Sequence, residues 1–144
     1  MPAVTKRLIH MKCLDEGSTP SSSTRPGRFE YEVEAEATYH HVRNGVQRAG
    51  YAAIVGSGPN VNIWHYRDSG RKMEAGDLVV MDYGGSLDYM IIDITRTWPA
   101  SGEFNERQER AYLCTLEAEK AIIAAMGGQP AAIAWSEVYT ALQT

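Results

Sequence analysis

Residues 79–99, VVMDYGGSLDYMIIDITRTWP, most strongly constrain what this chain can fold into. The apolar residues are typical of two paired strands in a core, yet each strand carries an aspartate, Asp82 and Asp93. An ionised carboxylate in an apolar sheet costs stability unless a partner compensates for the lost water. The identity of that partner is therefore the first question that the sequence raises.

The tract GGSLD between the two strands predicts a hairpin that turns at residues 87–88. In that register Asp82 lies directly opposite Asp93, and both side chains point to the same face of the sheet. Carboxylates so close repel each other, so either one takes up a proton or a cation lies between them. Carboxylate oxygens suit Mg, Mn, Co or Zn. The alternative is that each aspartate pairs with an arginine or caps a turn.

The rest of the sequence predicts an α+β domain in which the strands are mainly antiparallel. The expected elements, in chain order, are a helix over 29–48, a strand, loop and strand over 51–66, strands over 78–83 and 89–97, a helix over 105–126 and a further helix from about 131. Residues 13–27 are dominated by Ser, Thr, Pro and Gly, which is typical of a linker. We therefore expect an N-terminal segment and linker over 1–28 and one domain over 29–144.

Composition disfavours several classes of protein. The chain is 44% hydrophobic, which is enough for a core, and its net charge of -4 comes with no run of Lys or Arg that would predict nucleic-acid binding. No apolar run approaches the roughly 18 residues of a membrane span. The two cysteines lie far apart, which is not a disulfide framework and favours the reducing cytoplasm.

The segment NIWHY places His65 at the end of a predicted strand, before a polar loop. A lone histidine is more often structural than catalytic, but this position keeps His65 as a candidate site residue. Tyr66 follows it closely enough to remain a candidate substrate contact. His40 and His41 are expected to be structural, because adjacent positions on a helix point about 100° apart and do not form a shared metal site by themselves. His10 is also expected to be structural.

Three motifs in combination resemble the pita-bread metallopeptidases. The motifs are YAAIVGSGPNVNIWHYRDSG, EAGDLVVMDYGGSLDYMIIDITRTWPASGEFNERQ and the helix that precedes them. The resemblance runs from about Arg25 to the end of the chain. His-Tyr at 65–66 is most similar to the branch of Xaa-Pro aminopeptidases and prolidases. The fold implied is the first half of a pita-bread fold, with an antiparallel sheet and helices on one face.

The resemblance also implies a function and roles for individual residues. A family member would use two divalent metal ions (Mn, Co or Zn), with Asp82 binding one and Asp93 bridging both. His65 would lie beside the substrate, a peptide with proline at its second position, and help to hold or protonate it; Tyr66 would contribute to substrate binding. The reaction implied is removal of the N-terminal residue next to proline.

One departure from the family limits these expectations. The family's metal centre has five ligands, two Asp, one His and two Glu, and the His and both Glu lie downstream of the part matched here. We therefore expect a truncated chain that binds metal weakly at most and is inactive alone. A non-catalytic peptide- or protein-binding module that retains half of the fold is the alternative. A symmetric homodimer that replaces the missing half is a further expectation.

Overall fold

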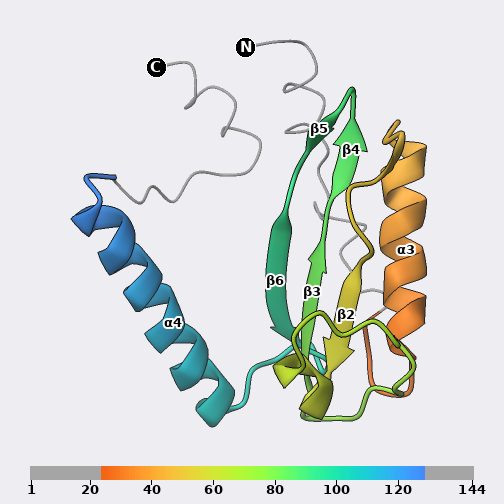
Figure 1. Ribbon diagram of the computed structural model, residues 1–144. Coiled ribbons are helices and arrows are strands. Elements are labelled where there is room, and N and C mark those ends of the chain that lie inside the picture. The colour runs from red at the N-terminus through yellow and green to blue at the C-terminus, as the bar shows by residue number, and fades with distance from the viewer. Residues whose placement is uncertain (1–23, 129–144) are drawn as a thin grey trace. The chain divides into compact units, whose positions relative to one another are not determined.

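The computed structural model describes residues 24–128, so the helix expected from about residue 131 and most of the expected linker lie outside the described residues. The chain divides into two units, 1–103 and 104–144, and each is described by itself. The elements of the described part are α3 (Glu30–Arg43), β1 (Arg48–Ala49), β2 (Ile54–Ser57), a 3-10 helix (Gly58–Asn62), β3 (Leu78–Tyr83), β4 (Gly85–Leu87), β5 (Met90–Ile91), β6 (Ile94–Pro99) and α4 (Glu106–Ala125) (Figure 1).

Helix α3 begins where its first turn is acidic and where the Glu32 carboxylate accepts a 2.7 Å hydrogen bond from the Phe29 amide. These features satisfy amide groups that a helix start leaves unpaired. The helix ends at Arg43, earlier than the predicted residue 48, because Gly45 takes a left-handed φ of 87°. Helix α3 buries Glu30 in its first turn, and it buries three further residues that lie four apart on one side: Val33, Ala37 and His41.

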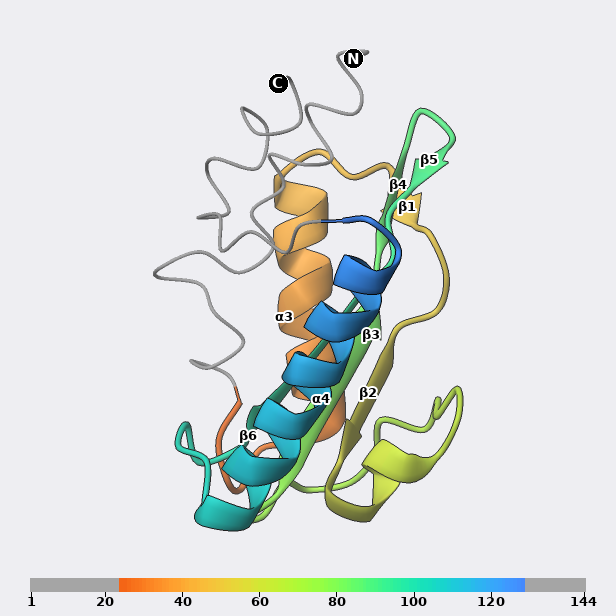
Figure 2. The ribbon, with the colours of Figure 1, turned by 90° about the vertical axis from the view of Figure 1, so that its left-hand side faces the viewer.

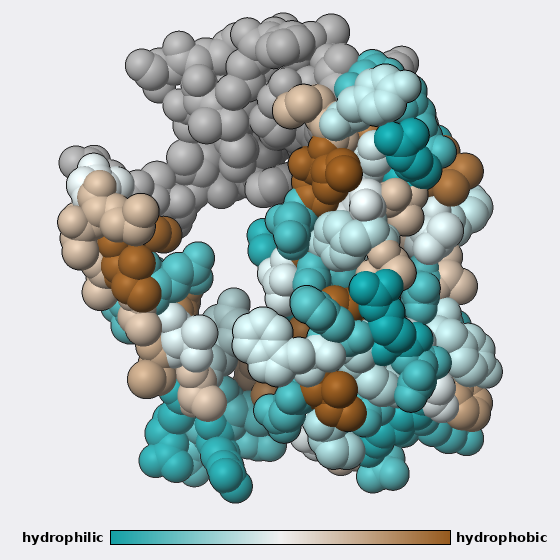
Figure 3. All heavy atoms as spheres, in the orientation of Figure 1, coloured by the Kyte–Doolittle hydropathy of each residue, from teal (hydrophilic) through white to brown (hydrophobic). Residues whose placement is uncertain are grey.

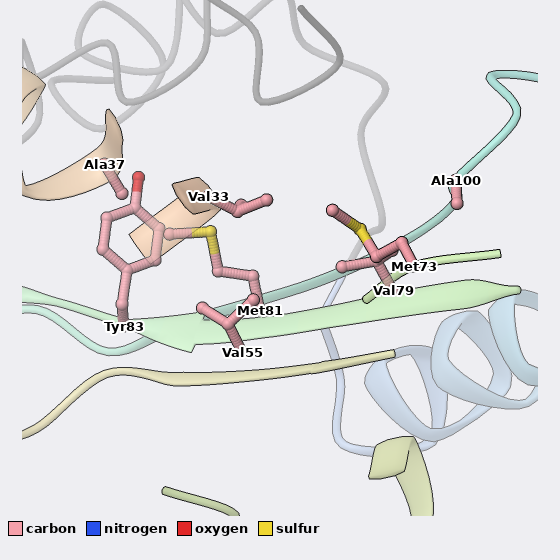
Figure 4. Close-up of a cluster of buried hydrophobic side chains, with 8 residues drawn as sticks. All are labelled: Val33, Ala37, Val55, Met73, Val79, Met81, Tyr83 and Ala100. Atoms are coloured by element: carbon pink, nitrogen blue, oxygen red, sulfur yellow. The ribbon is translucent and has the colours of Figure 1, made fainter. Parts of the chain in front are cut away.

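The described residues form two small antiparallel sheets, and the chain passes from one to the other at Gly84, between β3 and β4, and at residues 92–93, between β5 and β6. The first has the order β2-β3-β6 and the second the order β1-β4-β5. Burial alternates along β3, with Val79, Met81 and Tyr83 buried and the residues between them half-buried. The buried face packs against α3, and Figure 4 shows the core between them. The opposite face of β3, which carries Asp82, is left accessible.

The hairpin turns one residue later than the sequence predicts. Ser86 pairs with Ile91, so the turn residues are Asp88 and Tyr89, with φ of 48° and 65°. Two residues with positive φ match the twist of a two-residue hairpin. The Gln47 side chain stabilises this turn, since its Oε1 accepts from the Asp88 amide at 2.9 Å and its Nε2 donates to the Asp88 carboxylate at 2.8 Å.

The predicted pairing of Asp82 with Asp93 is therefore wrong. Asp82 lies opposite Thr95 on β6, and the second predicted strand is interrupted at residues 92–93. The prediction failed because a shift of one residue in the turn moves every cross-strand pair by two positions.

The segment after β2 also differs from its prediction, since no second strand forms over residues 61–66. A 3-10 helix with Pro59 in its first turn follows β2 directly. Figure 2 shows this segment at the end of the sheet that is remote from the β4–β5 hairpin. The polypeptide then returns to β3 through turns, in which His65 has a left-handed φ of 53°.

Helix α4 forms where the sequence predicts it. The Asn105 side chain accepts a 3.0 Å hydrogen bond from the Gln108 amide, and Gln108 Oε1 accepts one from the Asn105 amide, also at 3.0 Å. The helix ends before Gly127, whose φ is 84°. Its apolar side chains are largely exposed within the described residues, and Figure 3 shows them as brown and tan spheres along the helix.

Candidate metal centre

Asp82 is presented by the middle of the first sheet. On β3 it lies between Ile54 of β2 and Thr95 of β6, its partners in the register. Its side chain alternates with the buried Met81 and Tyr83 and so projects from the face opposite α3. The residue is half-buried, which leaves the carboxylate accessible to a ligand from solvent.

Asp93 lies in the interruption between β5 and β6 rather than within a strand. The interruption faces Gly84, which separates β3 from β4 on the partner strand. A Cβ atom at Gly84 would overlap the carbonyl of Ile92, so the two chain segments approach more closely here than side chains allow. Asp93 is exposed at this break in the pairing.

The two carboxylates meet at one atom, the hydroxyl of Tyr51. Its oxygen is 2.7 Å from Asp82 Oδ1 and 3.1 Å from Asp93 Oδ1. Tyr51 lies two residues after the end of β1, and the neighbouring Gly50 amide anchors this part of the backbone by donating to the Gly84 carbonyl at 2.9 Å. The aspartates thus converge as the sequence predicts, although through the break at residues 92–93 and not through direct pairing.

The convergence places two carboxylates around one hydroxyl group, which cannot compensate the charge of both. A phenol has a single proton, so Tyr51 donates to one carboxylate at a time while its lone pairs face the other. Burial, followed by the hydrogen bond and negative charge of Asp82 and then those of Asp93, raises the pKa of Tyr51 well above its usual range. Tyr51 therefore stays protonated and cannot neutralise either carboxylate.

No arginine or lysine within residues 24–128 forms an ion pair with Asp82 or Asp93. The alternative that each aspartate has its own arginine thus finds no support in the described part of the chain. Two oxygen-donor carboxylates that face one point fit a hard divalent cation. Nevertheless, residues 24–128 contain no cluster of three or more His, Cys, Asp or Glu side chains that could hold a metal.

His65 and Asp82 line the same pocket on the accessible face of the sheet. The pocket has a volume of about 440 Å³ and is bordered by the segment that follows β2 and by the strands. Its lining residues are Ile54, Val61, Asn62, Ile63, Trp64, His65, Val80, Asp82 and Thr95. His65 is exposed and has a φ that non-glycine residues seldom adopt, a form of strain that is concentrated at functional sites.

Tyr66 is placed differently from His65. Only 8% of its surface is exposed, and its hydroxyl donates to Glu30 Oε2 at 2.8 Å. It is not among the residues that line the pocket. Of the four predicted site residues, Asp82 thus shares a pocket with His65 and a hydrogen-bond partner with Asp93. The fourth, Tyr66, points into the interior.

Two residues of this region were missed by sequence reasoning, Tyr51 and Glu30. Tyr51 lies within one of the motifs that resemble the family, but nothing in the neighbouring sequence signals that its hydroxyl reaches residues 31 and 42 positions away. Glu30 is one of several acidic residues in a helix whose glutamates are otherwise at least partly exposed. The only signal in the sequence is that Glu30 lies three residues before Val33, and so on the same side of the helix as an apolar residue.

Comparison with known proteins identifies the family. The model of metallopeptidase family M24 matches residues 8–144. This chain belongs to metallopeptidase family M24. The curated relatives include the Xaa-Pro aminopeptidase of Haemophilus influenzae, which is 39% identical over 101 residues, and that of Escherichia coli, which is 42% identical over 93 residues. These alignments cover 70% and 65% of this chain but only 24% and 21% of the relatives.

Solved structures of the same family support the fold. Proline aminopeptidase P II from Yersinia pestis matches with a TM-score of 0.75 and 35% identity, over 83% of this chain and 27% of that chain. Zinc-substituted E. coli aminopeptidase P in complex with product matches with a TM-score of 0.69 and 34% identity, over 80% of this chain and 25% of that one. The predicted α+β first half of a pita-bread fold is confirmed by these matches.

Proposed function

We propose that this family M24 chain contributes to a metal-dependent exopeptidase of the Xaa-Pro aminopeptidase type, which removes the residue next to proline. The observation that carries the proposal is the convergence of Asp82 and Asp93 on the Tyr51 hydroxyl beside a pocket that His65 also lines. The relatives named Xaa-Pro aminopeptidase and Xaa-Pro dipeptidase supply the substrate class.

Asp82 and Asp93 would hold the metal ions, and Mn, Co or Zn all accept carboxylate oxygens. When bound, such ions polarise a carbonyl and lower the pKa of water. The Tyr51 hydroxyl orients the two carboxylates by hydrogen bonding, as neighbours of metal ligands commonly do. His65, exposed at the pocket, is placed to hold a peptide or to exchange a proton with it.

Two carboxylates alone hold a divalent cation weakly, because tight sites need more ligands and more surrounding hydrogen bonds. The chain spans about a quarter of the length of the curated relatives it matches. We therefore propose weak Mn²⁺ binding and little or no turnover for this chain by itself. The alternative is a binding module that takes up peptides without metal.

A binding experiment with matched peptides tests the proposal. Calorimetry measures the affinity of the chain for an Ala-Pro-Ala peptide and for Ala-Ala-Ala, each with and without Mn²⁺. The proposal predicts tighter binding of the proline peptide, strengthened by Mn²⁺ in the wild type and not in Asp82→Asn. Equal affinities for both peptides would contradict the substrate class, while proline-selective binding that ignores Mn²⁺ would favour the binding module.

Two further expectations remain proposals of the same kind. A cytoplasmic location is supported by the exposed free thiol of Cys114, which a reducing compartment keeps unpaired. Within the described residues, no helix combines the length and apolar character needed to cross a bilayer. A homodimer stays a prediction, and light scattering that shows only monomer at high concentration would contradict it.

A further inference from the structure

Glu30 is a charged residue with no exposed surface. Its Oε1 accepts hydrogen bonds from the Ser57 amide (2.6 Å), the Ser57 hydroxyl (2.7 Å) and Asn60 Nδ2 (3.2 Å). Its Oε2 accepts from the Tyr66 hydroxyl (2.8 Å) and the Arg71 amide (3.0 Å). Five donors thus surround one carboxylate at the start of α3.

All five donors belong to one segment of the chain, residues 57–71. The segment runs from the end of β2 to the turns before β3, and its only regular element is the 3-10 helix Gly58–Asn62. A short 3-10 helix has few internal hydrogen bonds, so the shape of such a segment depends on its contacts with the rest of the protein. Glu30 therefore bonds the segment near its beginning at Ser57, near its middle at Tyr66 and at its end at Arg71.

The same segment carries the pocket residues Trp64 and His65. Both are exposed, Trp64 by 90%, and the only ring contact recorded for either within the described residues is with the other, at 6.3 Å between centroids. Their own side chains are therefore poorly anchored. The neighbouring Tyr66, by contrast, points inward and bonds Glu30. The backbone at His65 is therefore anchored through Tyr66 and Glu30, neither of which lines the pocket.

We propose that Glu30 is a positioning residue, which holds the 57–71 segment so that His65 and Trp64 border the pocket above Asp82. The inference rests on the proposed function for the nature of the ligand, but the positioning itself rests only on the five hydrogen bonds. Glu30 does not reach the pocket and acts through the segment.

A neutral isostere separates this role from simple packing. In Glu30→Gln one of the two acceptor oxygens becomes an NH₂ donor, which then faces either the Ser57 and Asn60 donors or those of Tyr66 and Arg71. Either three or two of the five bonds then cannot form, whereas the apolar contacts of α3 with the sheet are unaltered. The segment should loosen while the sheet keeps its structure.

Amide hydrogen exchange of the full chain measures this directly. In Glu30→Gln we expect exchange at Ser57, Arg71 and the residues between them to rise at least tenfold, with Val79 and Met81 of β3 unchanged within twofold. Tyr66→Phe, which removes a single donor, gives a smaller rise in the same segment and serves if Glu30→Gln does not fold. Glu34→Gln makes the same chemical change one turn along α3 and should leave the segment unchanged.

Two ligand titrations complete the test. In Glu30→Gln we expect Mn²⁺ affinity to stay within twofold, since Asp82 and Asp93 do not depend on the segment, and affinity for Ala-Pro-Ala to fall at least tenfold. Exchange that is unchanged in the segment, or that rises equally in β3, would overturn the positioning role. If the wild type binds no proline peptide, the proposed function fails, and the exchange result still decides the role of Glu30.

Discussion

Gly84 lies so close to the carbonyl group of Ile92 that a side chain at position 84 would overlap it. The contact occurs where the pairing between the two long strands is interrupted, immediately before Asp93. Gly84 also packs against the ring of Tyr51, since an added Cβ would lie 3.2 Å from it. The missing side chain at position 84 thus leaves room both for the backbone that precedes Asp93 and for the ring of Tyr51, whose hydroxyl bonds Asp82 and Asp93.

Gly84→Ala tests this contact. Overpacking at a tight backbone crossing should destabilise the fold by about 1–3 kcal/mol and weaken Mn²⁺ binding at least fivefold. Urea denaturation and calorimetry measure the two effects. Gly70→Ala is the matched control, because an added Cβ there meets only the Asp68 carbonyl oxygen at an ordinary 3.5 Å. Equal stability and metal binding in the two variants would contradict this assignment for Gly84.

Tyr51→Phe removes the shared hydroxyl and keeps the ring. Without that donor the two carboxylates lose a common hydrogen bond and their fixed orientation. Loss of such a neighbour of metal ligands typically costs 10–100-fold in affinity. We expect a roughly tenfold fall in Mn²⁺ affinity by calorimetry, with no change in far-UV circular dichroism. An unchanged affinity would show that the hydroxyl does not organise the aspartates.

The sequence predicted most of the regular structure because the signals there are local. The Asn105 and Gln108 pair marks the start of α4, and the apolar run that begins at Leu78 marks β3. The position of the hairpin turn depends on a contact forty-one residues away, between Gln47 and Asp88. No local pattern contains that contact, so the predicted register was wrong.

The candidate site was predicted in part for a similar reason. Asp82 and Asp93 stand out because charge is unexpected between apolar residues, and they do converge. The partner of Tyr66 is Glu30, which lies thirty-six residues away and looks in the sequence like any first-turn glutamate of a helix. A hydrogen bond between residues so far apart in the sequence decides which of two adjacent residues, His65 or Tyr66, faces the pocket.

Glu30 should make stability depend on acid. Burial alone would raise the pKa of Glu30, but the hydrogen bonds from Ser57, Arg71, Tyr66 and Asn60 together hold it below its usual value of 4.5. Its contribution is therefore complete above about pH 4.5 and is lost as the pH falls through the lower folded-state pKa. The difference in unfolding free energy between wild type and Glu30→Gln should shrink from pH 6 to pH 3. A difference independent of pH would contradict this account.

His41 should make stability depend on pH in a higher range. Its ring stacks on Tyr83 at 4.6 Å, and burial followed by the charge of His40 lowers its pKa from 6.5. The unfolded chain then binds more protons, so the unfolding free energy falls as the pH drops below about 6.5. Urea denaturation at pH 7.5 and 5.5 should show this fall in the wild type and less of it in His41→Phe, which keeps a stacked ring. Equal falls in both proteins would contradict it.

The central claim is that Asp82 and Asp93 form one cation site. Calorimetric titration of the purified chain with Mn²⁺, beside Asp82→Asn and Asp93→Asn, tests it most directly. The account predicts saturable binding with a Kd of roughly 1 mM, comparable to the weakest carboxylate sites for divalent cations. Each single variant should lose that binding. Binding that survives in both variants, or no binding by the wild type, would contradict the claim.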